Sequence, residues 1–203
     1  MSNNSSLLVI DLGSEHMLNI LSITDGLNIM AVRALPPRAE SILSTVNPIG
    51  IILAGGNANA SSVPHGSLDM VLKSGLPLFA IGSAMLWLAQ QGRATVSGHA
   101  NAQFGSQSIH LDSSDPLFAG LEDVQTVWVN HHDIVTSLPP SLRSIGCHPS
   151  LRHLAAFSDR QNRWWGTHFH PEHEETVCGR QMFANFVERI CKQIHKEEVA
   201  SLN

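Results

Sequence analysis

The residues best suited to do chemistry are a histidine and a glutamate two positions apart, His170 and Glu172, with Pro171 between them. The proline fixes the direction of the chain, which allows the glutamate carboxylate to turn back toward the imidazole. A carboxylate that orients an imidazole is the base half of a nucleophilic triad. Taken alone, the pair also fits a structural histidine beside a surface glutamate.

A second segment, residues 80–85 with the sequence AIGSAM, is typical of a nucleophile elbow. In an elbow, a strand runs directly into a helix through small residues. The tight turn then presents one side chain beside the helix N-terminus, which stabilises negative charge. Gly82 and Ser83 occupy the turn. The same residues are also compatible with an ordinary strand-to-helix junction.

A third turn contains paired glycines, Gly55 and Gly56, directly after the apolar residues 50–53. Glycines let backbone N–H groups approach a ligand closely, so this turn could donate hydrogen bonds to an oxyanion. An ordinary turn between a strand and a helix is the alternative.

To act together, these three turns must lie at the same edge of a β-sheet. The pattern of apolar residues predicts an α/β fold that contains such a sheet. Short runs rich in Leu, Ile and Val alternate with helical stretches, which favours a parallel sheet with helical crossovers. In an open sheet of this kind, ligands bind beyond the carboxyl ends of the strands. The predicted strands are 7–12, 28–34, 50–53 and 76–81, and the predicted helices are 15–23, 38–46, 67–74 and 84–91.

The second half of the chain predicts more strands and one long helix. Residues 152–169 read as two strands around a polar turn, a hairpin added to the sheet. Residues 178–194 carry apolar side chains on one face, as in a helix that packs on a sheet. Further short strands are predicted within 95–111 and 125–129. We expect one domain over residues 6–194, with flexible tails at 1–5 and 195–203.

Composition narrows the functional classes. The net charge is -5 and basic residues form no run, so neither nucleic acid nor an anionic membrane is an expected partner. No apolar run is long enough to span a bilayer and no secretory signal is evident, which predicts a cytoplasmic protein. The three widely spaced cysteines fit reduced thiols better than disulfides or a zinc knuckle. We expect no cofactor.

Histidines are frequent, with twelve in the chain, and one cluster raises the alternative of a metal site. In a strand, His168 and His170 would point the same way, and an i, i+2 pair of imidazoles is able to bind zinc. His173 and Glu172 would complete the set of ligands. The turn at Pro171 already accounts for His170, so our prediction for metal is none.

Five segments together resemble the class I glutamine amidotransferases, most closely the glutaminase part of GMP synthases. That part carries motifs close to ILDFG, GIILSGGP, PVFGICYGMQ, SHGD after a tryptophan, and YGVQFHPE. The resemblance runs over residues 6–193 and implies a flavodoxin-like, mostly parallel sheet flanked by helices. The matching segments are LLVIDLG at 7–13, PIGIILAGG at 48–56, GLPLFAIGSAMLWLA at 75–89, WVNHHD at 128–133 and WGTHFHPE at 165–172.

The resemblance also implies a function: a cysteine, a histidine and a glutamate hydrolyse glutamine and pass ammonia to a synthetase. It implies a synthetase subunit or another protein as partner, and a small amide such as glutamine as ligand. By position, His170 is the general base, Glu172 its orienting acid, Gly56 and the Ser83 amide the oxyanion donors, and His131 and Asp133 part of a loop that holds glutamine.

The departures from the family pattern decide the prediction. Gly82 stands at the position of the catalytic cysteine, and a glycine has no side chain to attack an amide carbon. We therefore predict a glutaminase-dead pseudoenzyme or a binding and regulatory subunit. The alternative is a hydrolase or amidotransferase with altered chemistry that uses His170 and Glu172 with Ser83 or water. Other departures are Ser83, Ala84, Leu86, His132 and His168.

Overall fold

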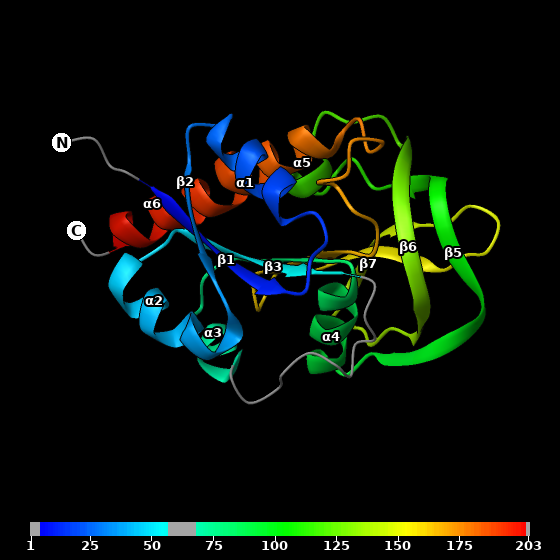
Figure 1. Ribbon diagram of the computed structural model, residues 1–203, viewed down its shortest axis with the longest axis horizontal. Helices are drawn as coiled ribbons and strands as arrows, with labels where there is room; N and C mark the ends of the chain where they lie inside the picture. Colours follow the sequence, from blue (N-terminus) through cyan, green and yellow to red (C-terminus); the bar gives the residue numbers. More distant parts are fainter. Residues whose placement is uncertain (1–4, 57–67, 202–203) are drawn as a thin grey trace.

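The computed structural model describes residues 5–56 and 68–201, which form a mixed sheet between helical layers (Figure 1). Within those residues the strand order is β2-β1-β3-β4-β9-β8-β7-β5-β6. The strands are β1 (Ser6–Leu12), β2 (Met30–Ala34), β3 (Gly50–Gly55), β4 (Leu78–Ile81), β5 (Thr95–Leu111), β6 (Val124–Ser137), β7 (Arg143–Cys147), β8 (Leu154–Asp159) and β9 (Trp164–Thr167). The helices are α1 (Met17–Asp25), α2 (Ala39–Val46), α3 (Asp69–Lys73), α4 (Ser83–Gln91), α5 (Gly179–Asn185) and α6 (Lys192–Ser201), with short segments η1 (Pro36–Arg38), η4 (Pro116–Phe118) and the π-helical η5 (Phe186–Cys191).

The first five strands of this order pair in parallel, and helices cover both of their faces. In Figure 1, α1, α5 and α6 lie on one side of the sheet, and α2, α3 and α4 on the other. Alternate residues of β1 divide between the two cores, because successive side chains of a strand point to opposite faces. Leu7 and Val9 join the core under α1 and α5, while Leu8 and Ile10 join the core under α2 and α4. The predicted α/β fold is confirmed.

The antiparallel part is larger than the single hairpin that the sequence predicts. The hairpin itself is present as β8 and β9, and β7, β5 and β6 extend the sheet beyond it. Sequence analysis missed β7 and ended the second strand of this region at residue 129. In the structure β6 continues to Ser137, because the 17-residue β5 supplies an antiparallel partner along most of that length.

The C-terminal segment also differs from the prediction, which ended the last helix at residue 194. The chain continues as α6 to Ser201, and none of the residues in α6 is buried. Only Ile194 of this helix packs against the core, and so few apolar residues give too weak a hydrophobic periodicity for the pattern to reveal the helix. It is supported by pairs such as Gln193 with Glu197, 3.0 Å apart, and by an ion pair between Arg163 and Glu198.

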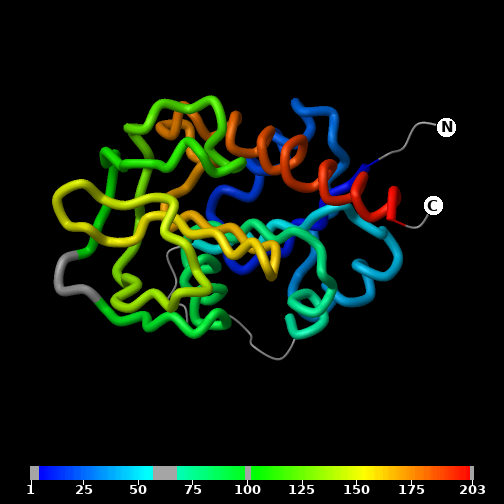
Figure 2. Tube along the Cα trace, turned by 180° about the vertical axis from the view of Figure 1, so that it is seen from behind, coloured from blue at the N-terminus to red at the C-terminus, as the bar shows by residue number. Residues whose placement is uncertain are grey.

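Seen from behind, the start of β1 and the end of α6 lie on the same side of the molecule, away from β5 and β6 (Figure 2). The residues of the turn between β4 and α4, Ile81 to Ser83, are buried. Among the helices that the structure describes, none has the length and apolar character needed to cross a membrane.

Candidate active site

The turn between β4 and α4 has the backbone of an elbow, with Gly82 at its apex. Gly82 has φ 62° and ψ -130°, a conformation that residues with a side chain rarely adopt. A Cβ added at Gly82 would lie 2.9 Å from Cε1 of His170. The position of a nucleophile's side chain therefore faces the imidazole, as the sequence predicts.

The imidazole of His170 is held by Glu172, at 2.9 Å from Nδ1 to Oε1. Both residues are buried, with exposures of 2% and 3%. A carboxylate accepts hydrogen bonds, so Nδ1 is the donor in this contact. Nε2 has no hydrogen-bond partner among the described residues. A buried imidazole oriented by a carboxylate in this way has the geometry that general bases use.

Backbone contacts fix the position of this pair. The amide of His170 donates to the carbonyl of Trp128 on β6, at 2.9 Å. The hydroxyl of Thr176 donates to the carbonyl of His170 at 2.8 Å, and it accepts from the amide of Trp128 at 2.9 Å. The base is therefore attached to the antiparallel part of the sheet, while Gly82 belongs to the parallel part.

Ser83, which follows Gly82, does not point its hydroxyl at His170 as a hydrogen-bond partner in this conformation. Its Oγ is buried and, like Nε2 of His170, has no hydrogen-bond partner within the part of the chain that the structure describes. It lies against Gly55, 2.6 Å from the point where a Cβ on that glycine would stand. The hydroxyl would have to leave this contact before it could reach the imidazole.

One of the two predicted oxyanion donors, the amide of Ser83, is already engaged in this conformation. The amide of Ser83 donates to the carbonyl oxygen of Gly56 at 3.2 Å. The carbonyl oxygens of Gly55 and Gly56 each lie 3.2 Å from the Cβ position of Gly82. Two carbonyl oxygens, which are hydrogen-bond acceptors, therefore lie beside the apex of the turn.

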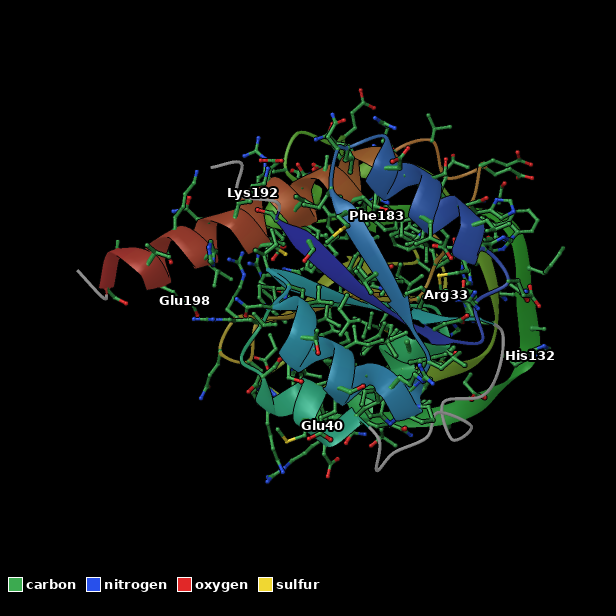
Figure 3. All side chains as sticks on the ribbon, turned by 60° about the vertical axis from the view of Figure 1, so that its left-hand side comes forward. Arg33, Glu40, His132, Phe183, Lys192 and Glu198 are labelled. Atoms are coloured by element: carbon green, nitrogen blue, oxygen red, sulfur yellow. The ribbon has the colours of Figure 1, made fainter. Side chains whose placement is uncertain are left out.

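His131 and Asp133 lie in strand β6 and not in a loop, which corrects the sequence prediction. They pair with Gln103 and Gly98 of β5. The ring of His131 stacks on the ring of His168, with centroids 3.6 Å apart. Between them in sequence, His132 points outward at the edge of the molecule, so it cannot line the site (Figure 3).

His168, His170, His173 and Glu172 do not come together as a set of metal ligands within the described residues. Across residues 5–56 and 68–201, no three His, Cys, Asp or Glu side chains gather as metal ligands. His168 is stacked on His131 and His170 is bound to Glu172, so the two rings do not share a ligand position. Burial, and then the nearby rings of His131, His170 and His153, hold the pKa of His168 well below its usual 6.5.

The geometry of elbow, imidazole and carboxylate agrees with a comparison of the sequence with known families. Residues 8–190 match the family described as glutamine amidotransferase class-I. The chain belongs to the class I glutamine amidotransferase family.

Curated relatives within this family are longer than the chain. It is 31% identical to the glutamine-hydrolysing GMP synthase of Haemophilus ducreyi over 198 residues, which cover 93% of the chain but 38% of that protein. The fold matches a crystal structure described as that of a GMP synthase subunit from Thermoplasma acidophilum, with a TM-score of 0.87, 24% identity and coverage of 98% and 99%. It also matches a glutamine amidotransferase from Thermotoga maritima, with a TM-score of 0.70, 18% identity and coverage of 97% and 86%.

One residue near the amidotransferase site was missed by sequence reasoning. His16, in the turn after β1, lies edge-on to His170 with ring centroids 5.7 Å apart, and edge-on to His173 at 4.9 Å. His173 in turn stacks on Trp128 at 4.2 Å. The sequence could have indicated His16, because it follows the predicted strand LLVIDLG, and ligands bind beyond the carboxyl ends of such strands.

Proposed function

We propose that this chain is a glutaminase-dead amidotransferase that acts as a binding or regulatory subunit. The single observation that carries the proposal is Gly82 at the apex of the elbow, opposite His170. Amide hydrolysis in this family pattern begins when a thiolate attacks the carboxamide carbon and ammonia leaves. Glycine cannot form that bond, and sites that lose a nucleophile retain about 10³-fold over water at best.

The proposed partner is a synthetase on a separate chain, and the proposed ligand is a small amide such as glutamine. Support comes from the relatives: the GMP synthase of H. ducreyi extends well beyond the matched region, and the T. acidophilum fold relative is described as one subunit of such an enzyme. The unit that would dock is a single domain that starts at residue 6 and includes α6.

The test is an assay of glutamine hydrolysis that measures glutamate, with and without a separate GMP synthetase chain. We expect the unaltered chain to form glutamate no faster than the His170→Ala variant does. Glutamine hydrolysis that persists in Ser83→Ala and is lost in His170→Ala would refute the proposal of a glutaminase-dead chain. It would also indicate that water is the nucleophile. Glutamine binding without turnover, measured by calorimetry, is the result that supports a binding subunit.

A second candidate is a hydrolase with altered chemistry, favoured by the intact pair of His170 and Glu172. A buried imidazole oriented by a carboxylate is able to activate water or a displaced Ser83. Incubation with a panel of small esters and amides tests this function. Hydrolysis by the unaltered chain that is lost in Glu172→Gln supports the altered hydrolase. Equal rates of hydrolysis by the unaltered chain and by Glu172→Gln speak against it.

A further inference from the structure

The imidazole rings of His131 and His168 stack face to face, with centroids 3.6 Å apart and planes that differ by 22°. His131 belongs to β6, whereas His168 follows β9 and stands two residues before His170. His168 is buried, and its Nε2 has no hydrogen-bond partner among the described residues. The stack therefore joins a strand of the antiparallel part to the segment that carries His170.

Few other contacts hold this segment against β6. The strands β9 and β6 are not neighbours, because β8, β7 and β5 lie between them in the sheet. The amide of His170 donates to the carbonyl of Trp128 at 2.9 Å, and the hydroxyl of Thr176 bridges the same two residues. No ladder of strand pairing supports these bonds, so the stack of imidazoles is a substantial part of the attachment.

The stacked rings border a small cavity of about 20 Å³, which is room for one water molecule. Its walls come from β5, β6, β8 and the turn after β7. The described residues that line it include no Asp, Glu, Lys or Arg. Its polar side chains are those of Gln103, Gln107, His131, His148, His153 and His168. A charge formed on either ring of the stack thus meets no opposite charge in this cavity.

The groups that act on His168 all oppose its protonation. Burial lowers the pKa of His168 most, and the rings of three other histidines lower it further, those of His131, His170 and His153. The nearest carboxylate in sequence, that of Glu172, is already bound to Nδ1 of His170. Asp133, further along β6, lies beside Gly98. The closed stack therefore holds a neutral His168, while a ring released to water has an ordinary pKa of about 6.5.

From these contacts we infer that the stack of His131 on His168 is an acid-sensitive latch that holds His170 against β6. Below about pH 6.5, His168 takes up a proton when its ring leaves the stack for water. Because the closed form excludes this proton, the ratio of open to closed chains rises by up to about tenfold per pH unit. Opening breaks the stack and, two residues further on, the bond of His170 to Trp128.

The latch adds regulation by pH to the site of the proposed function, and it rests on that function only for its consequence. An open latch displaces the imidazole of His170 from its place opposite Gly82. A ligand that binds between the elbow and this imidazole then loses one wall of its site. Mild acid therefore weakens ligand binding, whereas neutral pH permits it.

Hydrogen exchange of backbone amides, followed by NMR between pH 5 and 7.5, tests the latch on the unaltered full chain. The amide of His170 reports the latch, and the amide of Ile51, bound to the carbonyl of Pro77 at 2.8 Å, reports unfolding of the parallel part. After correction for intrinsic exchange rates, we expect His170 to be protected at least about tenfold less than Ile51. Its protection should fall by up to about tenfold per pH unit below 6.5. Equal protection of the two amides, or protection of His170 that does not change with pH, overturns the inference.

His168→Gln removes the proton acceptor, and glutamine stands at this position in the motif YGVQFHPE of the GMP synthase glutaminase part. Its matched control is His132→Gln, because His132 is exposed on β6. The protection of the His170 amide should become much less dependent on pH in His168→Gln and keep its dependence in His132→Gln. Equal dependence in both variants overturns the inference.

The exchange measurement on the unaltered chain decides the case in which His168→Gln does not fold. None of these measurements uses glutamine. Turnover of glutamine would defeat the proposed function and leave the exchange of the His170 amide unchanged, so the two failures are distinguishable.

Discussion

The Cβ position of Gly82 points at the imidazole of His170 and lies 2.9 Å from its Cε1. The elbow holds the strained conformation of a nucleophile turn, with φ 62° and ψ -130°, although its apex is a glycine. On the opposite side, the imidazole retains its carboxylate partner at 2.9 Å. The turn and the carboxylate-bound imidazole are thus both present, and the proposed loss of glutaminase activity rests on the glycine at the apex of the turn.

Gly82→Cys should therefore create a measurable glutaminase. The new Cβ would lie 2.9 Å from His170 Cε1, so the ring has to shift by a few tenths of an ångström. Because a nucleophile contributes several orders of magnitude, even a poorly placed thiol should raise glutamate release at least about tenfold over the unaltered chain. Gly82→Ser is the matched variant, in which a hydroxyl of much weaker nucleophilicity should give less. No gain in a folded Gly82→Cys protein would mean that the glutamine pocket or the oxyanion donors are also lost.

The turns that carry this site could be predicted because each is local in sequence. Small residues at a strand end specify the elbow at Gly82, and Pro171 alone directs Glu172 toward His170. The direction of the Gly56 carbonyl could not be predicted, since a contact across the sheet with the amide of Ser83 sets it. The approach of His16 to His170 likewise depends on how β1 and β9 are ordered in the sheet.

Stability should fall as the pH is lowered below about 6.5, and His168 should account for part of the loss. The pKa of His168 is lowered in the folded chain, so between that value and 6.5 the unfolded chain binds a proton that the folded chain does not. The free energy of unfolding then rises with pH in this window, by up to about 1.4 kcal/mol per pH unit for one proton. Above 6.5 the contribution is fully present.

Urea denaturation at several pH values between 5 and 7.5 measures this slope. His168→Gln removes the titrating group, and the slope should become shallower by up to the same amount per pH unit. His132→Gln is the matched control, because His132 is exposed on β6 and should leave the slope unchanged. If the free energy of unfolding of His168→Gln depends on pH as steeply as that of the unaltered chain, other groups cause the acid sensitivity.

Gly55 should be needed for the close approach of β3 to α4. A Cβ added there would lie 2.4 Å from the amide nitrogen of Ala84 and 2.8 Å from the carbonyl of Ile81, which are backbone atoms that cannot move aside separately. Gly55→Ala should lower the free energy of unfolding by about 1–3 kcal/mol. Gly98→Ala, whose nearest contact would be Asp133 Oδ1 at 3.7 Å, should change it by less than about 0.5 kcal/mol. Equal stability of the two variants would show that the elbow tolerates a wider spacing.

The two buried thiols, Cys178 and Cys191, should react too slowly to act as substitute nucleophiles. Burial raises the pKa of Cys178 from 9.0 to about 11, which lowers its thiolate fraction near neutral pH about hundredfold, and burial also raises the pKa of Cys191. Alkylation of Cys178 by iodoacetamide should therefore become faster by about tenfold per pH unit from 7 to 10, followed by mass spectrometry of the labelled peptides. In Gly82→Cys, the new thiol beside His170 should be labelled before Cys178 at pH 7. Rapid labelling of Cys178 in the unaltered chain at pH 7 would contradict the prediction, because it would show that burial does not raise the pKa of this thiol.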